Sequence, residues 1–249
     1  MRVALCLCGL VGSDRGKSYD KKGGTDKVLE GCFDSIKKHI INNNQVDVFF
    51  HTWDQSFEKE LVKKYKPKLY KTEPQKIFYN TVLGPGKRVQ AHYSKWYITK
   101  IVNSLKQQYE KEHNFKYDYV MLSRFDMVWN TDVLFNNLNK NKFYIPGSIK
   151  HKVSWGWPNN ESGLPYEIDD LWFISNSENM DNFCNIYDLI NTYIEKEKCP
   201  TFKGISNHML AFFHLKKLNL IPNNTEKLFC GEVGLRTSNS DYQIYRNKL

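Results

Sequence analysis

The sequence lacks several features that would place it at once in a large class of proteins. It contains no apolar run close to the roughly 20 residues that a membrane helix needs, so we expect no transmembrane segment. It has no Cys-x-x-Cys pair, and none of its six cysteines has the spacing of structural zinc ligands. Because most of the cysteines fall on apolar faces, we expect reduced, buried thiols and a cytoplasmic protein.

Dense basic blocks are also missing, although the formal net charge is +9. The lysines are scattered and often stand beside asparagines, as in NNLNKNK at 136–142. A nucleic-acid-binding arm would concentrate its charge, so we expect no nucleic-acid partner and only a mild attraction to anionic ligands. The beginning, MRVALCLCGLVGS, resembles a signal peptide but has no Ala-x-Ala-like cleavage site, and a strand ending in a glycine turn explains it better.

Strand and helix patterns alternate along the first half of the chain. Strands are expected at 3–8, 46–53, 68–73 (at a sheet edge) and 119–129, and helices over 29–40, 58–65 and about 93–110. This order is typical of the α/β class and predicts a mainly parallel central sheet flanked by helices on both faces.

The second half changes character. Strands are expected at 142–147 and 168–175, helices over about 178–196 and 204–218, and a polar, irregular tail from about 225. We find neither an internal repeat nor a linker in the sequence, so we expect a single domain over residues 1–249.

The stretch GLVGSDRGKS, which begins at Gly9, nearly spells a phosphate-binding P-loop. That motif needs four residues between its glycines, and here Gly12 and Gly16 enclose only three. Lys17 and Ser18 complete the partial match, so a P-loop-like nucleotide kinase stays an alternative. The interpretation that we favour is a glycine turn at the carboxyl end of a central strand, where open α/β sheets bind nucleotides.

Two further strand ends carry polar residues. His51 and Asp54 follow the buried run of DVFFHTWD, and His51 either bonds to the loop backbone or contacts a nucleotide. In YVMLSRFDMVW, Arg124 and Asp126 point to the same face of one strand, about 6–7 Å apart. They form a salt bridge, or they hold a ligand: a divalent metal on the carboxylate and a diphosphate on the guanidinium.

Asp169 and Asp170 stand at the head of the strand IDDLWFIS, about 44 residues after Asp126. A carboxylate near a metal–phosphate site is what a general base requires, and the alternative is a capping or loop-anchoring role. His208 and His214 lie six residues apart on one expected helix and do not share a face well, so at most one of them is a distal metal ligand.

Five segments together resemble a family of glycosyltransferases with a GT-A-like fold that occurs in bacteria and large DNA viruses. In chain order they are CLCGLVGSDRG, DVFFHTWD, HYSKWYI, YDYVMLSRFD and DDLWFISNSENMDNF. The resemblance covers residues 1–185. Two departures stand out: the first loop is longer than usual, and the Asp-x-Asp metal motif of many such enzymes is reduced to Arg124-x-Asp126.

The resemblance implies a GT-A-like, Rossmann-like fold and transfer of a sugar from a UDP- or GDP-linked donor to the hydroxyl of a glycan or glycoconjugate. It implies a nucleotide-sugar-binding half over about 1–130 and an acceptor-facing half over about 131–249. It leaves open a metal cofactor, Mn²⁺ or Mg²⁺, and it implies the host cytoplasm if the protein is viral. A catalytically inactive binding module with this fold is a further alternative.

The resemblance also implies roles for individual residues. Donor contacts are expected from Gly9, Arg15, His51, Tyr93, Ser94, Lys95, Arg124 and Asp126. Asp126 is expected to bind the metal, with His208 as a second ligand, and Asp170, or failing that Asp169, to act as the base. Trp155, Trp157 and Tyr166 lie in an aromatic loop that would stack against the acceptor sugar.

Overall fold

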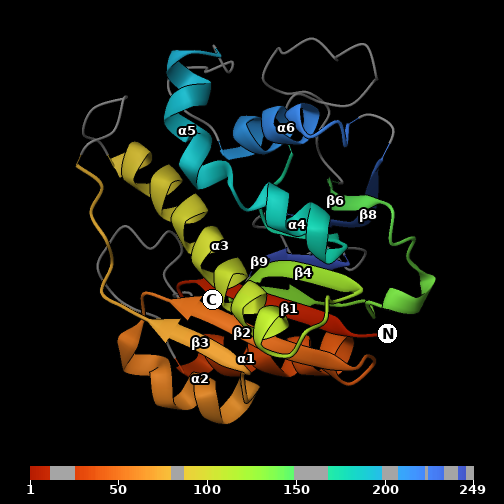
Figure 1. Ribbon diagram of the computed structural model, residues 1–249. Helices are drawn as coiled ribbons and strands as arrows, with labels where there is room; N and C mark the ends of the chain where they lie inside the picture. The colour runs from red at the N-terminus through yellow and green to blue at the C-terminus, as the bar shows by residue number, and fades with distance from the viewer. Residues whose placement is uncertain are drawn as a thin grey trace.

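One mixed sheet forms the centre of the molecule (Figure 1). The computed structural model describes residues 1–11, 26–79, 87–148, 168–197, 207–221, 224–232 and 241–244. Across these residues the sheet has nine strands in the order β3-β2-β1-β4-β7-β6-β8-β9-β5. The strands are β1 (Val3–Gly9), β2 (Val46–Thr52), β3 (Leu69–Thr72), β4 (Tyr119–Arg124), β5 (Met127–Trp129), β6 (Phe143–Ser148), β7 (Trp172–Ser175), β8 (Thr225–Glu232) and β9 (Tyr242–Ile244).

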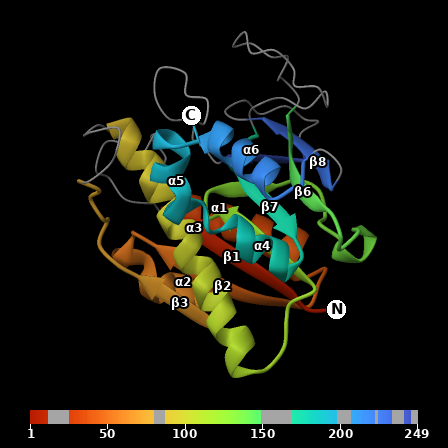
Figure 2. The same cartoon turned by 45° about the horizontal axis from the view of Figure 1, so that its top comes forward.

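Helices cover both faces of this sheet, as the alternating pattern predicts (Figure 2). They are α1 (Asp26–Ile36), α2 (Glu58–Tyr65), α3 (Lys87–Glu112), α4 (Ser177–Phe183), α5 (Ile186–Glu195) and α6 (Asn207–Lys217), with a π-helical turn at Lys37–Ile41 and short 3₁₀ turns at Gln55–Phe57 and Phe135–Asn137. Alternate side chains of β1 enter two apolar cores: Leu5 and Leu7 pack under α1 and α2, while Cys6 and Cys8 pack under α3, α4, α5 and α6. The expected α/β class is confirmed.

The sheet is mostly parallel, with antiparallel pairs in the part built by the second half of the chain. β3, β2, β1 and β4 run parallel, and β7 lies antiparallel to both β4 and β6. β8 is parallel to β6 and β9, and β9 is antiparallel to β5. Only two residues separate β4 from β5, although β5 ends the strand order. The sheet must therefore curve so that its β9-β5 end returns to the carboxyl end of β4.

Four expected boundaries were wrong. The long helix α3 begins at Lys87, not near residue 93. Its first turn has Val89 as a partly buried apolar residue, and the neighbouring Gln90 accepts a hydrogen bond from the N–H of Phe78 (2.9 Å), so the turn shows little of the apolar spacing that marks a helix in sequence. The strand expected at 119–129 breaks into β4 and β5. The helix expected at 178–196 is two helices, α4 and α5. The tail expected to be irregular contains β8 and β9, which pair with distant strands.

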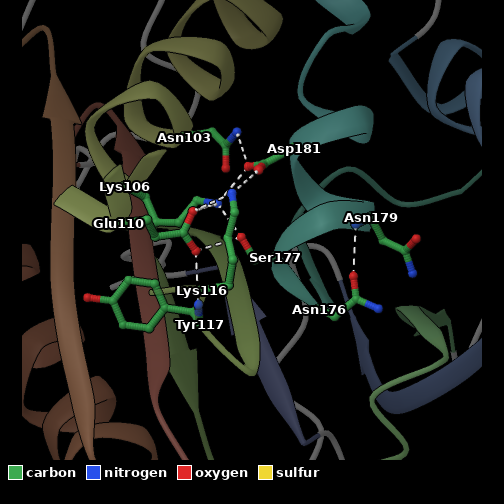
Figure 3. Close-up of polar contacts among 9 residues, drawn as sticks. All are labelled: Asn103, Lys106, Glu110, Lys116, Tyr117, Asn176, Ser177, Asn179 and Asp181. Atoms are coloured by element: carbon green, nitrogen blue, oxygen red, sulfur yellow. Dashed lines mark hydrogen bonds and ion pairs between the residues drawn. The ribbon is translucent and has the colours of Figure 1, made fainter. Parts of the chain in front are cut away.

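A buried ionic network fastens α3 to α4 and to the segment before β4 (Figure 3). Lys106, fully buried, donates to Glu110 Oε2 (3.0 Å), Ser177 Oγ (2.6 Å) and Asp181 Oδ1 (2.6 Å). Lys116 Nζ reaches the same two carboxylates, at 2.9 Å from Glu110 and 3.1 Å from Asp181. The two lysines and two carboxylates balance in charge, and the network positions α3 above the sheet.

The described cysteine side chains agree with the expectation of reduced thiols. Cys6, Cys8, Cys32 and Cys184 are free and buried, and burial raises the pKa of each thiol. Cys199 and the side chain of Cys230 lie outside the described part. Among the helices of the described residues, none is both long enough and apolar enough to cross a membrane.

Candidate functional site

The candidate site lies at the edge of the sheet where β1 and β4 end. These strands are parallel, with Cys8 opposite Arg124, so their carboxyl ends meet at one edge. β7 is antiparallel to β4, with Trp172 opposite Ser123, so its beginning lies at that same edge. The segment that leads into β7 therefore brings Asp170, 44 residues after Asp126, to the carboxyl end of β4.

Arg124 and Asp126 form a salt bridge with two hydrogen bonds at this edge. The chain turns between β4 and β5, and Arg124 Nε donates to Asp126 Oδ1 at 2.6 Å while Nη2 donates to Oδ2 at 2.5 Å. The sequence-based expectation of a continuous strand, with the two side chains about 6–7 Å apart, was wrong because the turn folds them together. The Asp126 side chain is 11% exposed and that of Arg124 is 35% exposed.

Asp170 is held in its ionised form. Burial by itself raises the pKa of its carboxyl, but neighbouring cations and a hydrogen bond from Asn207 lower the pKa to about 2. These charges are, in order of decreasing effect, His208 when it is protonated, Lys95 and Arg124. Asn207 Nδ2 donates to Asp170 Oδ2 at 3.2 Å. A carboxylate with so low a pKa is a strong partner for cations and a weak base.

The first residues of α6 border Asp169 and Asp170. His208 Nδ1 donates to the carbonyl oxygen of Ile168 at 2.8 Å, and the same nitrogen lies 3.9 Å from Asp169 Oδ1. The Asp169 side chain is 9% exposed. Both aspartates thus contact α6, which favours an anchoring contribution in addition to any chemical one.

Lys95 reaches the same edge from α3. Burial raises the pKa of Cys8, and Lys95 and Arg124 are the two cations that lower it in part. A Cβ atom added to Gly9 would lie 3.7 Å from Ile98 Cδ1, so this part of α3 passes the end of β1. The positive charge of Lys95, three residues before Ile98, lowers the pKa of both Cys8 and Asp170. We use the term charged cluster for Lys95, Arg124, Asp126 and Asp170.

Three residues expected to contact the donor are buried and make hydrogen bonds within the protein. His51 is fully buried, and its Nε2 lies 2.9 Å from Glu73 Oε1, so its partner is a carboxylate and not the loop backbone. Tyr93 donates its hydroxyl hydrogen to Asn191 Oδ1, and the residue is 4% exposed. Ser94 Oγ accepts a hydrogen bond from Trp53 Nε1 at 3.1 Å. The donor contacts of these side chains stay predictions.

Gly9 ends β1 with a φ of +109°, a conformation that favours glycine. Two residues later, the backbone N–H of Val11 donates to Asp54 Oδ2 at 2.7 Å. Asp54 thus holds the chain where it leaves the sheet edge. The glycine stretch beyond residue 11, with Arg15, Lys17 and Ser18, lies outside the described residues, as do the acceptor candidates Trp155, Trp157 and Tyr166.

Sequence reasoning missed Asn207 and Cys8 as neighbours of the charged cluster. Asn207 directly precedes His208, which had been singled out, but nothing in the sequence indicates that α6 begins against Asp170. Cys8 is the last inward-facing residue of β1 before the glycine turn, so the alternation of side chains along β1 could have predicted that Cys8 lies next to a site at the strand end.

A metal site requires free oxygen or nitrogen ligands, and the described residues do not fit one. Both carboxylate oxygens of Asp126 already accept hydrogen bonds from Arg124. Within the described part of the chain, no group of three or more His, Cys, Asp or Glu side chains is arranged to hold a metal ion. Asp126 and His208 are thus not part of a group of three or more such ligands in the described residues, and their role as metal ligands stays a prediction.

The chain was also compared with known proteins. No protein-family model matches it, and the search of curated proteins finds no match either.

Proposed function

We propose that the protein is a glycosyltransferase that moves a sugar from a nucleotide diphosphate-sugar to an acceptor hydroxyl, on a glycan or glycoconjugate. The observation that carries this proposal is the charged cluster at the carboxyl edge of an α/β sheet, the place where such sheets bind nucleotides. The resemblance of five sequence segments to GT-A-like glycosyltransferases points to the same chemistry.

In the proposed reaction, the bond from the anomeric carbon to the diphosphate breaks and the bond to the acceptor oxygen forms. Arg124 and Lys95 neutralise the negative charge that develops on the leaving diphosphate. In an inverting transfer, Asp170 accepts the proton of the acceptor hydroxyl, and Asp169 is the alternative base.

The low pKa of Asp170 is compatible with this role only once the donor is bound. In the free protein, His208, Lys95 and Arg124 hold the pKa of Asp170 at about 2 against the effect of burial. A diphosphate beside Lys95 and Arg124 would offset their charge and raise the pKa of Asp170, making it a better base. Donor binding would thereby activate the base.

The test compares the wild-type protein with Asp170→Asn. UDP- and GDP-sugars, with and without Mn²⁺, should raise the melting temperature of both proteins, because ligand binding stabilises the folded state. Hydrolysis of the stabilising donor, with water as acceptor, should fall about 10²–10⁴-fold in Asp170→Asn. Asp188→Asn, which breaks the exposed Lys100–Asp188 pair between α3 and α5, is the matched control and should leave hydrolysis unchanged.

Three other outcomes would favour a different function or a different role for Asp170. Stabilisation by nucleotide sugars without turnover in either protein would indicate the inactive binding module. Stabilisation by ATP–Mg²⁺ alone would indicate the P-loop-like kinase. Unchanged hydrolysis in Asp170→Asn would remove the base role from Asp170.

A further inference from the structure

The Arg124–Asp126 contact occupies one edge of the guanidinium, an edge that can also bind a phosphate. Its two N–H···O bonds, at 2.6 Å and 2.5 Å, form the paired geometry by which arginine also holds phosphate oxygens. Asp126 and a phosphate group would therefore bind the same atoms of Arg124, and they exclude each other there.

The charged cluster is also electrically balanced in the free protein. Lys95 and Arg124 supply two positive charges, and Asp126 and Asp170 supply two negative ones. Next to them, the charge of a protonated His208 is offset by Asp169, whose Oδ1 lies 3.9 Å from the His208 Nδ1. Burial lowers the pKa of Arg124, but Asp126 and then Asp170 outweigh it and raise the pKa, so the guanidinium is charged at any physiological pH. An incoming anion meets no net attraction from this cluster until one carboxylate withdraws.

Arg124 nevertheless offers a point of first contact. A guanidinium has five N–H groups, and hydrogen bonds to Asp126 use two of them. Its side chain is 35% exposed, whereas that of Asp126 is 11% exposed. An anion can thus contact the remaining N–H groups first and then displace the carboxylate.

We propose that Asp126 competes with the anionic ligand for Arg124. In the free protein the guanidinium is bound to Asp126, and a diphosphate binds by displacing the Asp126 carboxylate from it. This inference rests on the proposed function for the identity of the ligand. It gives Asp126 a role opposite to that of a metal ligand, because removing its charge strengthens anion binding.

The test measures binding of inorganic pyrophosphate by calorimetry in metal-free, low-salt buffer, where charge interactions are least screened. Asp126→Asn should bind pyrophosphate about tenfold more tightly than the wild type, equivalent to about 1.4 kcal/mol. The double variant Arg124→Met/Asp126→Asn should lose this gain, because the gain depends on a freed guanidinium. If Asp126→Asn does not fold, Asp126→Ser, which suits a turn, takes its place.

Asp132→Asn is the matched control. It removes the same charge from an ion pair with His39, in which the carboxylate is 52% exposed, and it should leave pyrophosphate affinity within about twofold of wild type. A gain in this control equal to that of Asp126→Asn would attribute the effect to net charge and overturn the proposal.

Equal or weaker pyrophosphate binding by Asp126→Asn would also overturn the competition, as would the absence of binding in both proteins. Failure of the proposed function looks different, since it is a lack of nucleotide-sugar hydrolysis by the wild type. A protein that binds pyrophosphate through a freed Arg124 but turns over no nucleotide sugar would keep the competition and lose the glycosyltransferase assignment.

Discussion

Gly9 is the residue at which β1 turns out of the sheet beside the charged cluster. Its φ of +109° is one that residues with a Cβ atom adopt only at a cost in free energy. A Cβ added there would lie 3.7 Å from Ile98 Cδ1, an ordinary contact, so the cost comes from the backbone and not from a clash.

We therefore expect Gly9→Ala to lower the free energy of unfolding by about 1–3 kcal/mol, measured by urea denaturation. Gly31→Ala is the control, because Gly31 lies inside α1, where alanine is favoured over glycine by up to about 1 kcal/mol. Opposite signs for the two substitutions are the expected result. A destabilisation of the same size at both positions would contradict the backbone explanation.

Sequence patterns identified the charged residues at this scale better than they identified their partners. Arg124, Asp126 and Asp170 were each singled out because charged side chains stood at strand ends. The pairing of Arg124 with Asp126 depends on a turn that an alternating apolar run conceals. The partner of the buried His51 is Glu73, a residue that the sequence pattern did not single out.

Among the elements, α3 connects the charged cluster to the rest of the fold. Lys95 lies toward one end of this helix, at the carboxyl edge of the sheet, and Lys106 lies three turns later in the ionic network (Figure 3). The network ties α3 to α4, which follows β7 directly. The ionic network therefore helps to set the position of Lys95 on α3 relative to Asp170, which precedes β7.

Lys106→Met should lower the free energy of unfolding by roughly 3–5 kcal/mol, because it leaves the buried Glu110 carboxylate and Asp181 without their central cation. Urea denaturation followed by circular dichroism measures the loss. Lys111→Met changes an exposed lysine of the same helix and should stay within about 0.5 kcal/mol of wild type. A loss below 1 kcal/mol in Lys106→Met would mean that Lys116 alone satisfies both carboxylates.

At the scale of the whole molecule, stability should depend on pH through buried histidines. His214 is 1% exposed and is bonded to the Tyr193 hydroxyl and the Asn182 carbonyl oxygen, which joins α6 to α5 and α4. Burial lowers its pKa from 6.5 to about 4, against the effect of the Asn182 bond. Between these values the unfolded chain binds the extra proton, so stability rises with pH; the contribution is complete above pH 6.5 and is lost as pH falls toward 4.

With about 1.4 kcal/mol for each pKa unit, this contribution is about 3 kcal/mol. We expect the unfolding free energy of His214→Gln to depend less steeply on pH than that of wild type between pH 6.5 and 4. The slope, not the absolute stability, is the readout, because the substitution also alters packing. His113→Gln, at an exposed position, should keep the wild-type slope, and parallel slopes for all three proteins would refute the assignment to His214.

The sequence by itself determined the α/β class, the two-sided burial of β1 and β2, and the positions of charged residues at strand ends. These features follow from local patterns, since apolar runs and helical spacing record which faces are buried. Only the tertiary structure decided that β7 runs antiparallel beside β4, that β8 and β9 complete the sheet, and that Arg124 forms a salt bridge with Asp126. Those outcomes depend on pairings between distant segments, in which direction and register are set by the whole packed sheet and not by the residues of either strand.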